Sequence, residues 1–148
     1  MIKFQFHHWD KLLSKAIRLF SGGFFNHVSI QMGDYIYEAH INTWVRKIAR
    51  IDWEDETVYT FYEYYLWPKR EKMVEDWLEK QVGKKYDTLG VLSFLWRFIP
   101  QSPWKFYCSE LAFIAFMKLH KITKENYNAK KTPQDFFELL YIRNHSSF

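Results

Sequence analysis

The sequence predicts an α+β fold in which an antiparallel sheet packs against helices. Short runs of alternating apolar and polar residues, typical of strands, occupy much of the first half of the chain. Longer apolar segments with helix start and stop signals dominate the second half. The chain has 148 residues, of which 48% are hydrophobic and 21% aromatic. We therefore expect one domain, residues 1–148, with a sizeable core.

The N-terminal segment predicts a strand followed by a helix. Residues 2–6 alternate apolar and polar side chains, as a half-buried strand does. Asp10 is suited to cap a helix over residues 11–20, which Ser21-Gly22-Gly23 would end. This helix has one apolar and one basic face. Such a helix either packs on its own domain or makes peripheral contact with a membrane, and both alternatives stay open.

The next segment predicts a β-hairpin. Two alternating runs, residues 26–32 and 35–40, flank the turn signal Gly33-Asp34. A two-residue turn there places Ser29 opposite Glu38 and His27 opposite His40. One face of the hairpin is then apolar. The other face carries His27, Ser29, Gln31, Ile36, Glu38 and His40. That second face is either merely solvated or part of a functional site.

Two further strands and a helix are expected after the hairpin. Residues 45–51 and 57–66 are rich in β-branched and aromatic side chains, which favour strands. Pro68 opens a predicted helix over residues 69–81, and Gly83 closes it.

The C-terminal part predicts three more helices. An apolar helix extends through Phe98, and another begins near Cys108 after the break at Pro103. The segment Thr132-Pro133-Gln134-Asp135 has the N-cap, N1 proline and N3 acid of a last helix, which should run to about Tyr141.

Charge and cysteine content narrow the classes of function. The net charge is +4, and no run of Lys and Arg is long enough to suggest a nucleic-acid partner. The single cysteine excludes an intrachain disulfide and a cysteine-only metal site. No signal peptide pattern is found, and no run approaches the ~18 apolar residues of a membrane span. We therefore expect a cytoplasmic protein.

Cys108 is the candidate nucleophile. A thiol in the first turn of a helix lies beside free backbone N–H groups and the positive end of the helix dipole. Both favour the thiolate, which is the reactive form. The alternative is a buried structural cysteine. Cysteine chemistry also needs a base and a third group that orients the base, and His27 and Glu38 supply one of each.

Several motifs resemble those of the permuted papain-like amidases, the YaeF/YiiX-like branch of the NlpC-type cysteine hydrolase superfamily. They occur in the family's order and span most of the chain. They are Asn26-His27-Val28-Ser29-Ile30, Tyr37-Glu38-Ala39, Gly83-Lys84-Lys85-Tyr86-Asp87, Phe106-Tyr107-Cys108-Ser109-Glu110-Leu111 and Thr132-Pro133-Gln134-Asp135. The resemblance implies a circularly permuted papain-like fold.

The same resemblance implies a catalytic triad of Cys108 as nucleophile, His27 as base and Glu38 as the orienting residue. Lecithin-retinol-acyltransferase-like proteins share the circular order but have a histidine where Glu38 stands, so Glu38 favours the amidase branch. The turn between His27 and Glu38 is a residue shorter than the family pattern. His40 therefore stays open as the third member.

The expected reaction is cleavage of an amide or ester acyl bond through a Cys108 acyl-thioester, without a metal or organic cofactor. The substrate would be a peptide, a peptidoglycan amide or a lipid acyl group. Tyr86, Tyr107 and the backbone N–H of Cys108 are candidates for stabilising the oxyanion. The alternatives are acyl transfer to an amine or alcohol, a non-catalytic binding module, and a zinc site. The zinc ligands would be His27, Glu38, His40 and Cys108.

Overall fold

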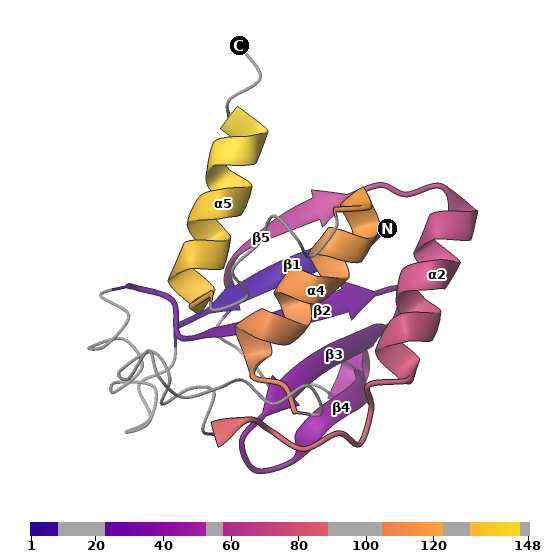
Figure 1. Ribbon diagram of the computed structural model, residues 1–148, viewed down its shortest axis with the longest axis vertical. Helices are drawn as coiled ribbons and strands as arrows, with labels where there is room; N and C mark the ends of the chain where they lie inside the picture. The colour runs from indigo at the N-terminus through magenta and orange to yellow at the C-terminus, as the bar shows by residue number, and fades with distance from the viewer. Residues whose placement is uncertain (9–22, 53–57, 89–104, 123–130, 146–148) are drawn as a thin grey trace.

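The computed structural model describes residues 1–8, 23–52, 58–88, 105–122 and 131–145 (Figure 1). The predicted helix over residues 11–20 and the helix through Phe98 lie outside these residues.

The described residues form an α+β structure, as predicted, with five antiparallel strands in the order β4-β3-β2-β1-β5. The N-terminal strand β1 therefore lies inside the sheet, between β2 and β5. The strand bounds are Ile2–His7 for β1, His27–Met32 for β2, Tyr35–His40 for β3, Trp44–Ala49 for β4 and Val58–Tyr64 for β5.

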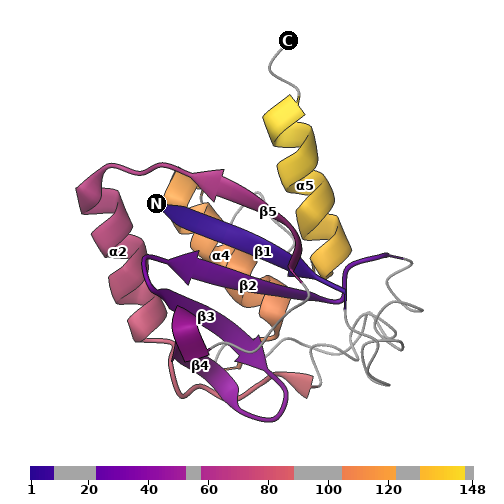
Figure 2. The same cartoon turned by 180° about the vertical axis from the view of Figure 1, so that it is seen from behind.

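Three helices accompany the sheet: α2 (Pro68–Glu79), α4 (Cys108–His120) and α5 (Pro133–His145). Helix α4 crosses one face of the sheet and packs on β2 and β3, while α2 lies beside α4 (Figure 1). From behind, the strands lie in front of these helices (Figure 2).

The predicted helix starts are confirmed at all three helices. Pro68 occupies the first turn of α2, where its missing N–H removes no intrahelical bond. Thr132 and Asp135 form a reciprocal cap at α5. The Thr132 Oγ1 accepts from the Asp135 N–H at 3.1 Å, and Asp135 Oδ2 accepts from the Thr132 N–H at 2.8 Å.

Several predicted element ends are wrong. β5 ends at Tyr64 rather than Leu66, and α2 ends at Glu79 rather than Gln81. Ile51 was expected in a strand, but β4 ends at Ala49 and a short 3-10 helix, Arg50–Asp52, follows. The Arg50 N–H still bonds to the Asp34 carbonyl at 2.8 Å in the register of the ladder. Asp34 belongs to the turn before β3, so β4 has no strand partner beyond this point. Helix α5 passes Tyr141 because Tyr141 stacks on His145 one turn later, with ring centroids 4.3 Å apart.

The core is aromatic and lies between the sheet and the helices. Phe4 and Phe6 point from β1 toward Phe136 of α5, and Phe113 and Phe116 of α4 contact the same ring. The Phe4 and Phe136 rings meet edge to face, with centroids 5.3 Å apart and planes at 90°. Phe136 therefore joins α4, α5 and β1. None of the described helices is long and apolar enough to cross a membrane.

Replacing Phe136 with alanine should lower the free energy of unfolding by about 3–5 kcal/mol, because the ring is fully buried and the cavity would not collapse. Phe61→Ala on β5 is the matched control, since that ring is 50% exposed; we expect a loss below about 1 kcal/mol. Urea unfolding of both variants measures the difference. Equal losses would contradict the central place given to Phe136.

Candidate active site

The β2–β3 hairpin brings His27 and Glu38 together. Its turn has two residues, as predicted, with Met32 paired to Tyr35 and Ile30 to Tyr37. Gly33 takes a φ of 55° at the first turn position, which a type II′ turn requires and which glycine adopts without strain. Across the strands, the His27 Nε2–H donates to Glu38 Oε2 at 2.6 Å.

Of the two candidates for the orienting residue, Glu38 bonds to His27 through its carboxylate. His40 is only partly buried, and its Nδ1 accepts from the Asn42 N–H at 3.3 Å within the following turn. The side chain of Glu38 is fully buried, whereas that of His27 keeps 5% exposure.

Arg46 neutralises the second oxygen of the same carboxylate. It lies directly opposite Glu38 on β4. Its Nε donates to Glu38 Oε1 at 2.8 Å, and its Nη2 bonds to the same oxygen. The buried carboxylate therefore lies between two cationic groups, an arrangement that burial of a charge requires.

The polar face of the hairpin is not a solvated surface, so that alternative is wrong. His27, Ser29, Gln31, Ile36 and Glu38 are all buried.

A directed chain of hydrogen bonds crosses this face from β1 to β2. Ser29 Oγ donates to Gln5 Oε1 at 3.1 Å, and the Gln5 amide donates to Gln31 Oε1 at 3.1 Å. Because the Ser29 hydrogen is used, the contact of His7 Nε2 with Ser29 Oγ at 3.0 Å makes His7 the donor there. The His7 ring also lies against the His27 ring, with centroids 5.3 Å apart.

Cys108 is the first residue of α4, as predicted. The preceding Tyr107 is extended, with φ −100° and ψ 165°, and no side chain caps the helix. The first N–H groups of α4 therefore have no intrahelical acceptor. Ser109 fixes this end, since its hydroxyl donates to the Lys131 carbonyl at 2.6 Å.

The Cys108 thiol reaches His27, and the two groups interact by a hydrogen bond and by charge. Nε2 of His27 is used by Glu38, so Nδ1 is the nitrogen available to the thiol. Burial alone would lower the pKa of His27. The Cys108 thiolate and the Glu38 carboxylate outweigh burial and raise this pKa above its ordinary 6.5. This balance favours the imidazolium form of His27.

Glu38 responds in the opposite sense. Burial would raise its pKa, but the hydrogen bond and charge of His27 and the charge of Arg46 lower it from 4.5 to about 2. The carboxylate is therefore ionised at neutral pH and stabilises a charged His27.

The two tyrosine candidates also lie near Cys108. Tyr86 forms a parallel bridge with Phe106, two residues before the cysteine. Burial first, and then the charge of Cys108, raise its pKa well above 10, so its hydroxyl is a neutral donor. Tyr107 is 1% exposed and belongs to the apolar core.

Two residues of this site were missed in the sequence. Arg46 was not identified because its place depends on the β3–β4 register, which the loop between Ile41 and Thr43 determines. His7 was not identified as a member of this face. The alternation of residues 2–6, extended by one residue, would have placed it on the polar face.

The zinc alternative receives no geometric support. Within the described residues, no three or more His, Cys, Asp or Glu side chains form a group that could hold a metal ion.

Comparisons of the chain with protein-family models, with curated proteins and with solved structures gave no match.

In the Glu38→Gln variant, the free energy of unfolding should no longer show the decrease at acid pH that protonation of the Glu38 carboxylate causes. The pKa of Glu38 is lowered in the folded state, so its stabilising effect is present above about pH 4.5 and disappears as the pH falls toward 2. A lowering from 4.5 to about 2 corresponds to roughly 3 kcal/mol. We expect the wild type to lose about that much more free energy of unfolding than Glu38→Gln between about pH 5 and pH 2.

Glu63→Gln is the matched control, because Glu63 pairs with Lys3 on the same sheet but remains 25% exposed. It should retain most of the acid dependence of the wild type. Chemical unfolding at a series of pH values gives all three curves. The same acid-induced loss in Glu38→Gln and wild type would contradict a buried, ionised Glu38.

Proposed function

We propose that the protein is a cysteine hydrolase of amidase or peptidase type, which cleaves an amide or ester acyl bond. The observation that carries the proposal is the position of His27, which contacts Cys108 on one side and bonds to Glu38 on the other. A nucleophile, a base and a residue that orients the base are the parts that thiol acyl chemistry needs.

The reaction starts from the thiolate–imidazolium pair. The Cys108 sulfur attacks the acyl carbonyl and forms a tetrahedral oxyanion, which the backbone N–H of Cys108 at the start of α4 can stabilise. When the carbon–nitrogen or carbon–oxygen bond breaks, His27 gives its proton to the leaving group. The acyl group then remains on sulfur as a thioester.

Hydrolysis of the thioester restores the enzyme. His27, now neutral, takes a proton from water, and the hydroxide attacks the acyl carbon. The acid product leaves, and Cys108 sulfur departs as the thiolate. Glu38 keeps Nε2 of His27 protonated throughout, so that Nδ1 faces the reacting atoms. Arg46 holds the carboxylate in place.

The order of these groups supports the finer assignment of the fold. His27 and Glu38 lie on neighbouring strands, and Cys108 follows later on a helix that packs on those strands. This arrangement agrees with the circularly permuted papain-like fold that the sequence motifs imply.

Acyl transfer to an amine or alcohol is the second candidate, and burial favours it. Cys108 and His27 are each only 4% exposed. A thioester shielded from water survives long enough to meet another acceptor. The same residues perform both reactions, and adding acceptor amines to the assay distinguishes transfer from hydrolysis.

Cys108→Ala should abolish turnover of a p-nitrophenyl acyl ester or thioester. His27→Ala should lower the rate by about 1,000-fold or more. Glu38→Gln should cost about 100-fold or more because the imidazole loses its orienting partner, whereas His40→Ala should change the rate only a few-fold. Initial rates, with circular dichroism as the folding control, test this series. Undiminished turnover in Cys108→Ala would refute the proposal, and a larger loss in His40→Ala would transfer the third role to His40.

The thiol should also react at low pH because of His27. The imidazolium partner stabilises the thiolate, so iodoacetamide should alkylate Cys108 near pH 6, where an ordinary thiol is almost wholly protonated. His27→Ala should remove most of this reactivity, and the exposed His145→Ala should leave it unchanged. Rates of alkylation against pH, followed by mass spectrometry, provide the measurement. Coincident profiles for wild type and His27→Ala would mean that His27 does not activate Cys108.

A further inference from the structure

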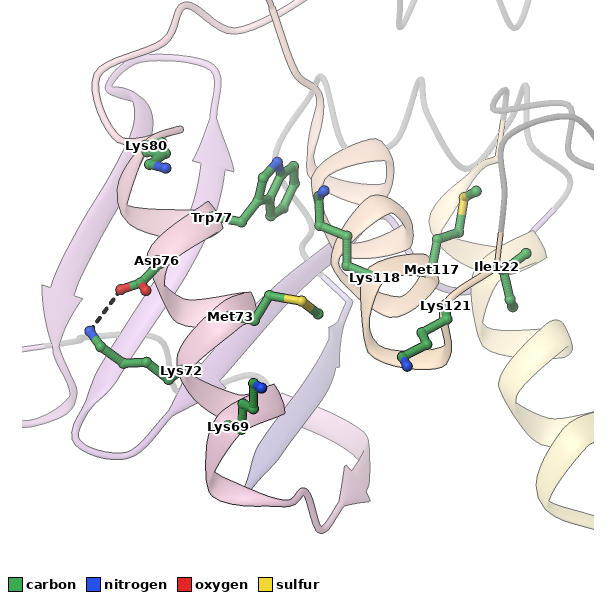
Figure 3. Close-up of a pocket in the computed structure, with 10 residues that line it drawn as sticks. All are labelled: Lys69, Lys72, Met73, Asp76, Trp77, Lys80, Met117, Lys118, Lys121 and Ile122. Carbon is green, nitrogen blue, oxygen red and sulfur yellow. Dashed lines mark hydrogen bonds and ion pairs between the residues drawn. The ribbon is translucent and has the colours of Figure 1, made fainter.

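A groove of about 650 Å³ lies between α2 and the C-terminal part of α4, away from Cys108 (Figure 3). Met73 and Trp77 of α2 point toward α4 and line it together with Met117 and Ile122. The two helices are tied at one end of the groove, where Arg70 Nη1 donates to the Leu119 carbonyl at 3.3 Å. The groove therefore has an apolar floor and a defined width.

The rim of the groove is strongly basic. Its charged residues are Lys69, Lys72, Lys80, Lys118, Lys121 and Asp76. Asp76 bonds to Lys72 at 2.7 Å, and the Lys118 ammonium lies 5.3 Å from the Trp77 ring centre. In the part of the chain that the structure describes, no carboxylate pairs with the other three lysines. The site thus has an excess of positive charge that the fold itself does not use.

Lys121 ends α4 in a conformation that does not suit lysine. Its φ is 56°, in the left-handed region that glycine or asparagine adopts at lower cost at this position. Helix termination therefore does not explain the lysine. Its exposed ammonium instead adds to the positive charge at the end of the groove that Lys69 also lines (Figure 3).

Two exposed aromatic side chains immediately precede α2. Tyr65 is 83% exposed and Trp67 is 82% exposed, and Lys69 follows within two residues. Large apolar side chains at such exposure stand out in a structure that buries most of the phenylalanines it describes. Tyrosine and tryptophan with neighbouring lysines are the residues that favour the boundary between lipid headgroups and acyl chains.

We propose that this groove and its lysine rim dock on an anionic membrane surface and bind the phosphate of a phospholipid headgroup. Lysines supply mobile point charges that suit phosphate. None of the lining residues is an arginine, the side chain favoured for bidentate recognition of carboxylates in an acidic peptide. The apolar floor accepts the glycerol and upper acyl part of the lipid, and Trp67 and Tyr65 enter the interface. This docking is independent of the proposed hydrolase chemistry.

Sedimentation of the full chain with vesicles tests the proposal. Wild type should bind phosphatidylcholine vesicles that contain phosphatidylglycerol, bind pure phosphatidylcholine vesicles weakly, and lose affinity as salt rises. Lys69→Gln with Lys121→Gln should weaken binding to anionic vesicles about 25-fold, on the basis of about 5-fold for each lysine near the surface. Trp67→Ala should weaken it further.

The matched control is Arg50→Gln with Lys85→Gln, which removes the same charge from exposed residues that do not line the groove. It should change binding less than about 3-fold, as distant charges are screened. Thermal unfolding checks that all variants are folded.

Three outcomes would overturn the proposal. Equal losses in the groove and control variants would mean that only net charge attracts the protein to lipid. Equal binding to neutral and anionic vesicles would exclude recognition of the headgroup charge. Binding of inorganic phosphate that the groove variant loses, without any binding to vesicles, would assign the groove to a soluble phosphate instead.

Discussion

The burial of one carboxylate, Glu38, constrains the arrangement of three strands. An ionised carboxylate away from water is tolerated only when cations and hydrogen bonds compensate for its lost hydration. His27 on β2 and Arg46 on β4 supply them from opposite sides of β3. A shift of either strand by one residue would turn its cation to the other face of the sheet and leave Glu38 uncompensated. The same carboxylate that would orient the base therefore also specifies strand register.

The same requirement applies to the uncharged groups on the polar face of the sheet: each buried polar atom needs a hydrogen-bond partner. Gln5, Ser29 and Gln31 satisfy one another across β1 and β2, and the chain of donors ends on the Gly33 carbonyl at 3.2 Å. Each hydrogen bond in this series has a defined donor and acceptor. His7 must therefore donate to Ser29, which places its proton on Nε2. The sheet thus has an aromatic core on one face and a hydrogen-bonded network on the other. The N-terminal strand β1, which lies between β2 and β5, contributes to both faces.

Local features of this structure were predictable, and those that depend on distant partners were not. The Gly33-Asp34 turn, the Thr132–Asp135 cap and the helix start at Cys108 each depend on neighbouring residues, and their sequence signals specified them correctly. The contact of His27 with Glu38 followed from the hairpin register. Arg46 was missed because its position depends on the next strand pairing, and β4 ended early because its partner β3 begins only at Tyr35. The burial of the polar face could likewise not be predicted, because a strand with a solvated polar face and one with a covered polar face show the same alternation of apolar and polar residues.

The candidate active site and the lysine groove lie at opposite ends of helix α4. Its N-terminal end places Cys108 beside N–H groups that have no intrahelical acceptor. At its other end, the Arg70 guanidinium donates to the Leu119 carbonyl, near the negative end of the dipole. A helix of 13 residues is about 20 Å long, so a membrane bound at the groove would lie roughly that far from the thiol. Docking at the groove would thus orient the protein on the surface without covering Cys108. Any lipid substrate would have to leave the bilayer plane to reach it, whereas a peptide substrate would approach from solution.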